Sequence, residues 1–359
     1  MANTFSNFFD TCITDSLDDG SDQRVLVFDK SGASLLMSLT PLPGSFFERQ
    51  LNATSIAEIE VAADDPDCCS QISDLFISQK IVWLRDDKTV WTGYITGLSW
   101  SINSVRIQAA DVTHWWSVRR IPTYRAIGKD SSVILADIHR LAMIEDPIDS
   151  IRIFSKLSGL PSEIDVRFEE NKMAIEIIEG LAEHSIDFTA LGDIILCGGP
   201  DFLPELPFSL TDDDWQNPPT IEARGPYSGF ATRIVGRNSA GDTIVKTADS
   251  KLIDIYGLVE RVIDFGYLTS WKELDRAVTS NLALFSSPYY LNFNENNSAL
   301  KTGAALPIMG MVPGVQIAVT STSMCKQFRQ RMRILSMRND ANGQVSITLE
   351  PVGATKGIF

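Results

Sequence analysis

One segment, residues 82–116, constrains the fold of this 359-residue chain more than any other part. It reads VWLRDDKTVWTGYITGLSWSINSVRIQAADVTHWW and contains five of the seven tryptophans. Residues 90–100, in its central part, alternate between the two faces of a long predicted strand. The polar residues at 86–88 and 103–104 are typical of turns. With a further short strand at 81–84, the segment predicts two β-hairpins end to end. Short strands that meet at tight turns favour a small barrel or sandwich.

Two glycines interrupt the long strand of this segment. Gly93 and Gly97 lie on the same face as Trp91 and Ile95. Glycine weakens the interior of a strand, so its presence there indicates a bulge, a bend or a close approach of another backbone.

The character of the sequence changes after residue 121. Residues 131–143 and 170–184 have the apolar spacing of helices, and a hairpin with Gly192 near its turn follows. Residues 201–220 are rich in Pro and Asp and are expected to form a linker or long loop. The other expected elements are strands at 24–29, 55–62, 315–319, 328–337 and 345–349, a helix around 67–77, a hairpin around 238–242, and a helix at 270–285 with Ser270 and Glu273 as a capping box.

The end of the chain repeats the order of elements seen at 81–110: strand, turn, long strand, tight turn, strand. The expected fold class is therefore mainly β with α+β inserts, with two β-barrel domains and smaller helical or α+β domains. The expected boundaries are 1–121 for the first barrel, 122–205 for an α+β domain, 206–266 for a hairpin segment of the second barrel, and 267–359 for a helix, the second barrel and closing strands.

Composition excludes several classes of protein. Hydrophobic residues make up 44% and charged residues 21%, as in ordinary globular proteins. No run of 18 apolar residues could form a transmembrane helix, and the N-terminus lacks the pattern of a secretory signal, so no stable membrane insertion is expected. The net charge of −15 repels free nucleic acid.

The sequence contains no recognisable catalytic or metal-binding motif. It lacks the metalloprotease, nucleophile-elbow, P-loop and dinucleotide signatures. The five cysteines are irregularly spaced and are expected to be reduced thiols, and the three consecutive aspartates at 212–214 are expected to lie in a solvated loop. No catalytic, cofactor-binding or metal-binding residue is therefore assigned, although a hydrolase that uses two carboxylates stays an alternative.

Three arginines form the main candidate contact site. Arg329, Arg331 and Arg333 share one face of a predicted strand. They could pair within the chain or contact nucleic acid or an acidic protein surface. Because residues 121–259 carry most of the negative charge, we favour pairing with the acidic body of a neighbouring copy.

Aromatic side chains of the opening segment form the second candidate group. Their alternation fits core packing or a subunit interface, and a carbohydrate-binding platform is the alternative. The group consists of Trp83, Trp91, Tyr94, Trp100, Trp115 and Trp116.

Several stretches together resemble the hub or minor tail proteins of siphophages. The N-terminal stretches are SIAEIEVAADDPD and the segment from IVWLRDD to WWSVRRI, which carries VWTGYITGL, Asp111, Arg119 and Arg120. The C-terminal stretches are LPIMGMVPGVQIAV and RMRILSMRNDANGQVSITLEP, and IYGLVERVIDF precedes the helix at 270–285.

The resemblance implies a structural, non-enzymatic protein with two tail-tube-like β-barrels. Three copies would form a homotrimeric ring of pseudo-sixfold symmetry, which joins the hexameric tail tube to a threefold tip and lines the DNA-ejection channel. The implied partners are the tail tube or distal tail protein, the tape-measure protein and tail-tip or receptor-binding proteins. DNA would pass without specific binding. The implied location is the virion, after synthesis in the host cytoplasm. A tail-associated cell-envelope hydrolase and a carbohydrate-binding adhesin are the alternatives.

Overall fold

The structure is a computed structural model of the chain. It describes residues 22–62, 74–148, 150–167, 170–183, 185–200, 202–223, 225, 229–266, 271–293, 299–301, 304, 306–322 and 327–352.

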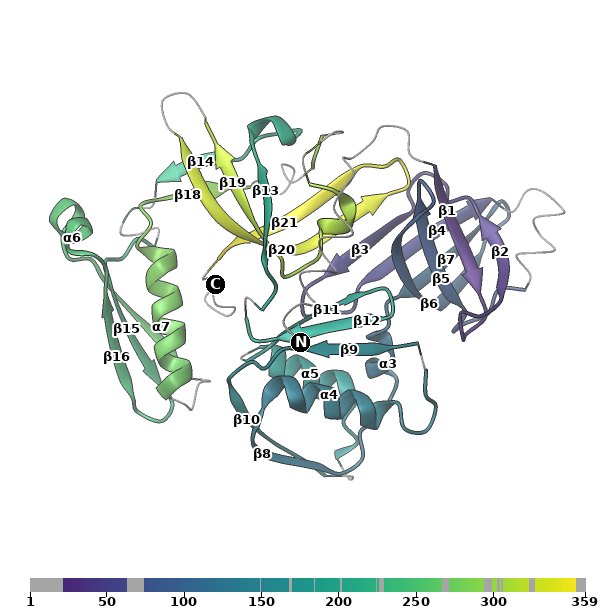
Figure 1. Cartoon of the computed structure of the whole chain (residues 1–359), viewed down its shortest axis with the longest axis horizontal. Helices are drawn as coiled ribbons and strands as arrows, with labels where there is room; N and C mark the ends of the chain where they lie inside the picture. Colours follow the sequence, from purple (N-terminus) through teal and green to yellow (C-terminus); the bar gives the residue numbers. More distant parts are fainter. Residues whose placement is uncertain are drawn as a thin grey trace.

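One large sheet of 11 strands organises the molecule (Figure 1). Its order is β13-β19-β20-β3-β4-β7-β6-β5-β1-β2, and β21 also pairs with β20. All its pairs are antiparallel except that of β13 with β19. The strands are β1 (Gln23–Phe28), β2 (Leu35–Leu39), β3 (Phe46–Gln50), β4 (Ile56–Ala62), β5 (Lys80–Arg85), β6 (Lys88–Trp100), β7 (Ser104–Ala110), β13 (Glu205–Leu210), β19 (Gln316–Ser321), β20 (Phe328–Asp340) and β21 (Val345–Pro351).

The mainly β class is confirmed, but the two strand groups are joined differently from the expectation. In the described part of the chain neither group closes into a barrel. The reason is β3, which pairs with β4 on one side and with β20 on the other. The edge that could have closed the first group instead continues the sheet into the second.

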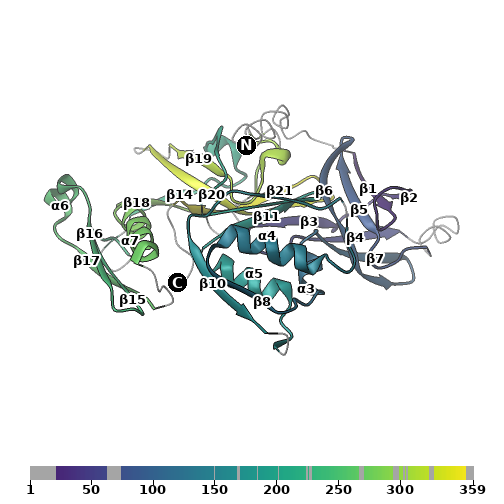
Figure 2. The ribbon, with the colours of Figure 1, turned by 60° about the horizontal axis from the view of Figure 1, so that its bottom comes forward.

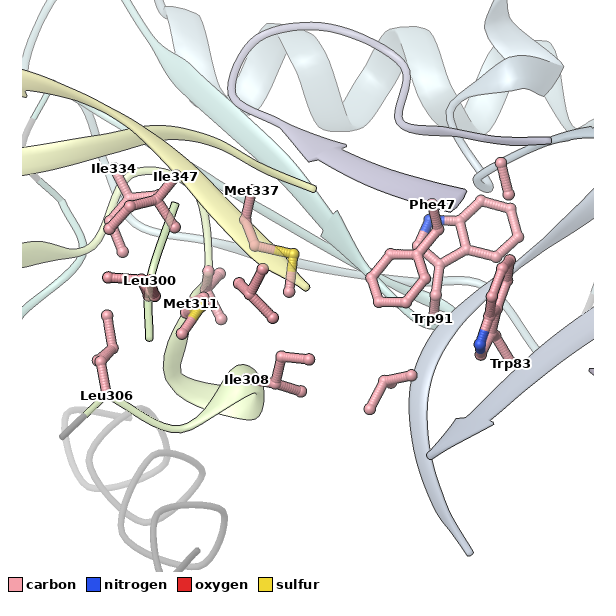
Figure 3. Close-up of a cluster of buried hydrophobic side chains, with 14 of the residues drawn as sticks. Phe47, Trp83, Trp91, Leu300, Leu306, Ile308, Met311, Ile334, Met337 and Ile347 are labelled. Carbon is pink, nitrogen blue, oxygen red and sulfur yellow. The ribbon is translucent and has the colours of Figure 1, made fainter. Parts of the chain in front are cut away.

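A continuous hydrophobic core lies along this sheet (Figure 3). Phe47, Trp83 and Trp91 form its aromatic centre, with ring centroids 5.3 Å apart for Phe47 and Trp83 and 6.4 Å apart for Phe47 and Trp91. Met311 and Met337 contribute from the C-terminal strand group. The core therefore crosses the β3–β20 junction and binds the two strand groups into one body.

An α+β insert packs beneath the sheet (Figure 2). It contains α3 (His114–Ser117), β8 (Tyr124–Asp130), α4 (Ser131–Ala142), β9 (Arg152–Ser155), β10 (Pro161–Val166), α5 (Ala174–Ala182), β11 (Asp187–Leu191) and β12 (Ile194–Gly198). The Asp130 side chain caps α4 by accepting from the backbone N–H of Ser132, and Gly192 has a φ of 61° at the β11–β12 turn. The insert has its own core, which includes Tyr94 of β6.

A smaller unit lies at one end of the molecule (Figure 1). It consists of β15 (Arg233–Asn238), β16 (Thr243–Thr247), α6 (Ser250–Tyr256), β17 (Glu260–Phe265) and α7 (Trp271–Phe285). The β15–β16 hairpin was expected in the second barrel, but it pairs with β17 and packs on α7 around a separate core. Its inward side chains, such as Ile234, pack against the apolar face of α7. The hairpin therefore buries its apolar face on α7 and not on the large sheet.

The expectation of a loop at 201–220 is wrong in its first half. β13 lies there and pairs with β19, and Trp215 is completely buried in the main core. The 3-10 helix η2 (Asp212–Asp214) directly precedes Trp215. The short strand β14 (Thr220–Ala223) follows it and pairs with β18 (Tyr289–Asn292). Pairing with a distant strand overrides a Pro- and Asp-rich composition.

The interpretation of the strand glycines is confirmed. The register of β6 against β7 shifts between Ile95 and Gly97, and a Cβ at Gly93 would lie 2.4 Å from the carbonyl oxygen of Ala110. The expected helix around 67–77 falls mainly outside the described residues, as do Ser270 and the side chain of Glu273.

Candidate functional site

The three candidate arginines of β20 differ in their surroundings. Arg329 is exposed. Arg331 is half exposed and pairs with Glu205 of β13, with Nη2 and Oε2 2.8 Å apart. Arg333 is only 6% exposed. The shared face read from the sequence thus becomes more deeply buried along the strand, and Arg329 and Arg331 keep the surface that an outside partner could reach.

Arg333 joins three parts of the chain. Its Nη1 lies 2.5 Å from Oδ2 of Asp187 at the start of β11, and its Nε donates to Glu350 of β21 at 2.7 Å. Asp187 also accepts from the side-chain amide of Asn52 at 2.6 Å. This buried network ties the insert to the large sheet, so it has a structural role inside one chain.

Arg49 is a second buried arginine, and the sequence interpretation missed it. It lies on β3 with its side chain 2% exposed, and it donates to the carbonyl oxygens of Ile308 and Met311 at 3.1 and 3.3 Å and to that of Val90. Burial lowers the pKa of its guanidinium to about 10, so it stays charged at neutral pH. The alternation of β3 places Arg49 on the face of buried Phe47, which is the signal that could have revealed it.

A third buried arginine links the two strand groups directly. Arg85 of β5 donates from Nη1 to the Oδ1 of Asn339 on β20 at 2.9 Å. Gln23 accepts from the Trp83 indole at 2.8 Å and from the Asn339 amide at 3.2 Å. Buried polar groups that satisfy one another in this way fix a single arrangement of the packed elements.

The candidate aromatic residues lie mostly in the interior. Trp83 and Trp91 belong to the main core, and the side chains of Tyr94, Trp115 and Trp116 belong to the core of the insert. Trp100 is 56% exposed at the end of β6. Because β6 contributes Trp91 to one core and Tyr94 to the other, its aromatic residues hold the two cores against one strand. Buried aromatic rings cannot stack on a sugar ring, so Trp100 is the one member of this group whose exposure suits the carbohydrate-binding alternative.

The buried titratable groups have shifted pKa values of the kind expected for side chains packed in a protein interior. Burial and the charge of Arg119 lower the pKa of His139 to about 4, and its Nδ1 accepts from the Trp116 indole at 3.0 Å. Burial raises the pKa of the Cys197 thiol to about 12, so this cysteine is unreactive. Burial and the charge of Asp193 raise the pKa of Tyr94 to about 12.

The aspartates at 212–214 act within the fold. Asp214 accepts from the backbone and side chain of Thr211 in a capping box, and Asp212 accepts from the backbone N–H of Thr322 at 2.6 Å. Within the described ranges, no three His, Cys, Asp or Glu side chains are placed to hold a metal ion. None of the helices described is both long and apolar enough to span a membrane.

Comparisons with known proteins identify the fold. No protein-family model matches the chain, and no curated protein matches it either. Among solved structures, the 43 kDa tail protein of prophage MuSo2 from Shewanella oneidensis is similar with a TM-score of 0.58 at 14% identity, over 92% of this chain and 98% of that one. A tail protein from Neisseria meningitidis MC58 has a TM-score of 0.56 at 12% identity, over 93% and 98% of the two chains.

A prophage tail protein, gp18 from Listeria monocytogenes EGD-e, is similar with a TM-score of 0.54 at 12% identity, over 93% of this chain and 95% of that one. The matches run along almost the whole length of each protein. The chain therefore has the fold of phage tail proteins, and the resemblance read from its sequence is confirmed at the level of the fold.

Proposed function

We propose that the chain is a structural, non-enzymatic subunit of a phage tail, located at the hub of the tail tip in the virion. The end-to-end fold likeness to the Shewanella prophage tail protein carries this proposal. Its implied partners are the tail tube or distal tail protein, the tape-measure protein and tail-tip or receptor-binding proteins.

The proposed assembly is a homotrimeric ring. Each chain contributes two strand groups, so three chains present six groups and can adapt a hexameric tube to a threefold tip. A ring requires a contact between two different surfaces that closes after three copies. A net charge of −15 suits a channel wall past which DNA slides without binding.

The internal construction supports a role in transmitting force. The β3–β20 pairing, the shared core and the networks of Arg85 and Arg333 hold the two strand groups in one arrangement. Breaking the β3–β20 pairing or either arginine network would leave buried polar groups without partners, which is costly. Such a body would move as a unit when neighbouring tail proteins rearrange.

The exposed arginines are proposed contacts between copies. Arg329 and the half-exposed Arg331 lie at the start of β20. We expect Arg329→Glu to weaken association at low salt more than at high salt, because exposed ion pairs are screened.

The mass of the purified full-length chain tests the assembly. Native mass spectrometry should give about 119 kDa, three times the 39.7 kDa of one chain, and negative-stain images should show rings. A monomer at all concentrations would refute the trimer. Release of peptide or sugar from purified cell envelopes would instead favour a hydrolase.

A further inference from the structure

The tip of the β6–β7 hairpin exposes two large apolar side chains. Trp100 is 56% exposed and Ile102 is 95% exposed, and only one residue separates them in the chain. The other four tryptophans of residues 82–116 are buried in the two cores, so packing does not account for Trp100. Single exposed apolar residues are common on protein surfaces, but two at one turn indicate a surface with a binding role.

Hydrogen bonds hold this turn in one shape. The backbone N–H of Ser101 donates to the carbonyl oxygen of Ser104 at 2.8 Å, and the backbone N–H of Ser104 donates to the Ser101 hydroxyl at 3.0 Å. The Ser104 hydroxyl donates to Glu60 of β4 at 2.6 Å, which fixes the tip to the neighbouring strand. Side chains on such a turn lose little conformational freedom when a ligand binds, so the tip is preorganised.

The tip carries no charge, although the chain is strongly acidic. No Asp, Glu, Lys or Arg occurs from residue 89 to residue 105, whereas the net charge of the whole chain is −15. Charges on the adjoining strands are engaged, because Arg106 pairs with Glu58 at 3.3 Å and Glu60 accepts from Ser104. A neutral ligand can therefore approach this surface freely, whereas the chain as a whole repels an anionic one.

Polar but uncharged side chains flank the exposed ring. Ser99 and Ser101 precede and follow Trp100 in the chain, and Asn103 lies in the same turn. All three are exposed. An apolar protein pocket that covered the ring would also remove these groups from water, which costs free energy when they gain no partner. A ligand that combines an apolar face with hydroxyl groups avoids this cost.

We propose that Trp100 and Asn103 form a binding site for neutral saccharides. The C–H groups on one face of a pyranose ring stack on the indole, and the sugar hydroxyls exchange hydrogen bonds with the Asn103 amide. Ile102 extends the apolar surface at the tip. This binding activity goes beyond the proposed structural role, and it does not depend on the ring of three copies.

The test is fluorine NMR of the full-length chain labelled with fluorotryptophan, with cellobiose and diacetylchitobiose as the probes. The Trp100 signal, assigned from the Trp100→Phe variant, should shift as each disaccharide is added. The affinity should be in the millimolar range, because one ring and one amide hold the ligand. Trp271 is the matched control, since it is 59% exposed at the start of α7 but precedes the charged Lys272. Its signal should stay in place.

Substitutions complete the test, with binding followed on the disaccharide by saturation-transfer NMR. Trp100→Ala should weaken binding about tenfold, Asn103→Ala should weaken it less, and Trp271→Ala should leave it unchanged. Unshifted signals of the buried tryptophans show that each variant is folded. Equal shifts of the Trp100 and Trp271 signals, or no shift of either, would overturn the proposal. A Trp100 signal that shifts with phosphatidylcholine vesicles but with neither disaccharide would also overturn it and would identify a lipid contact.

Discussion

Replacing Arg333 with Met gives the sharpest test of the internal network. Arg333 is 6% exposed, and its guanidinium is shared by Asp187 and Glu350. Arg333→Met fills most of the volume but leaves Asp187, which is 5% exposed, with the amide of Asn52 as its remaining donor among the bonds described above. Removing one partner of a buried ion pair costs about 3–5 kcal/mol, because the other charge stays buried.

Arg331→Met is the matched control on the same strand. Arg331 also pairs with a carboxylate, but its side chain is 56% exposed and that of Glu205 is 36% exposed. An exposed pair of this kind contributes about 0–1 kcal/mol. The free energy of unfolding, measured by urea titration with tryptophan fluorescence, should therefore fall several-fold more for Arg333→Met than for Arg331→Met.

Equal losses for the two variants would refute this reasoning. They would mean that water reaches Arg333 as freely as it reaches Arg331, and that the insert is not tied to the sheet at Asp187. A double variant, Arg333→Met with Asp187→Leu, should recover part of the loss, since it removes both buried charges together.

Three further predictions concern single side chains. The pKa of His139 is lowered to about 4 in the folded chain, so as the pH falls the unfolded chain takes up this proton before the folded chain does. The free energy of unfolding should therefore fall by about 2 kcal/mol between pH 7 and pH 5. His139→Asn should remove that part of the pH dependence, as measured by urea titrations at each pH. Trp83→Ala should cost about 3–5 kcal/mol because the ring is completely buried, whereas exposed Trp100→Ala should leave the melting temperature nearly unchanged; similar melting curves would contradict the packing assigned here. Gly93→Ala should destabilise the fold strongly because its Cβ would meet backbone, and Gly97→Ala should do so less because its Cβ would meet a movable side chain; expression and thermal melts compare the two.

Local patterns in the sequence were enough to predict most of the elements. The strands around residues 24–29 and 55–62, the long strand at 90–100 and the helix at 131–143 are present within a few residues of their expected limits. Alternation and helical spacing report which face of an element is apolar, and that property depends only on neighbours in the chain. The mainly β class follows from it.

The candidate site was only partly readable. Alternation placed Arg329, Arg331 and Arg333 on one face, but it could not show that Arg333 meets Asp187, 146 residues away in the chain. It also left Arg49 unnoticed, because an arginine between Glu48 and Gln50 is usually solvent-exposed.

The sequence alone determined the type and order of the elements, since propensity, periodicity and turn residues act over a few residues. Tertiary structure decided how they join. The sheet continues through β3 and β20, the β15–β16 hairpin packs on α7, and β13 forms within a Pro-rich segment and pairs with β19. Those outcomes depend on pairing and burial between residues far apart in the chain, where several partners compete for the same edge and face. Only the assembled three-dimensional structure resolves that competition.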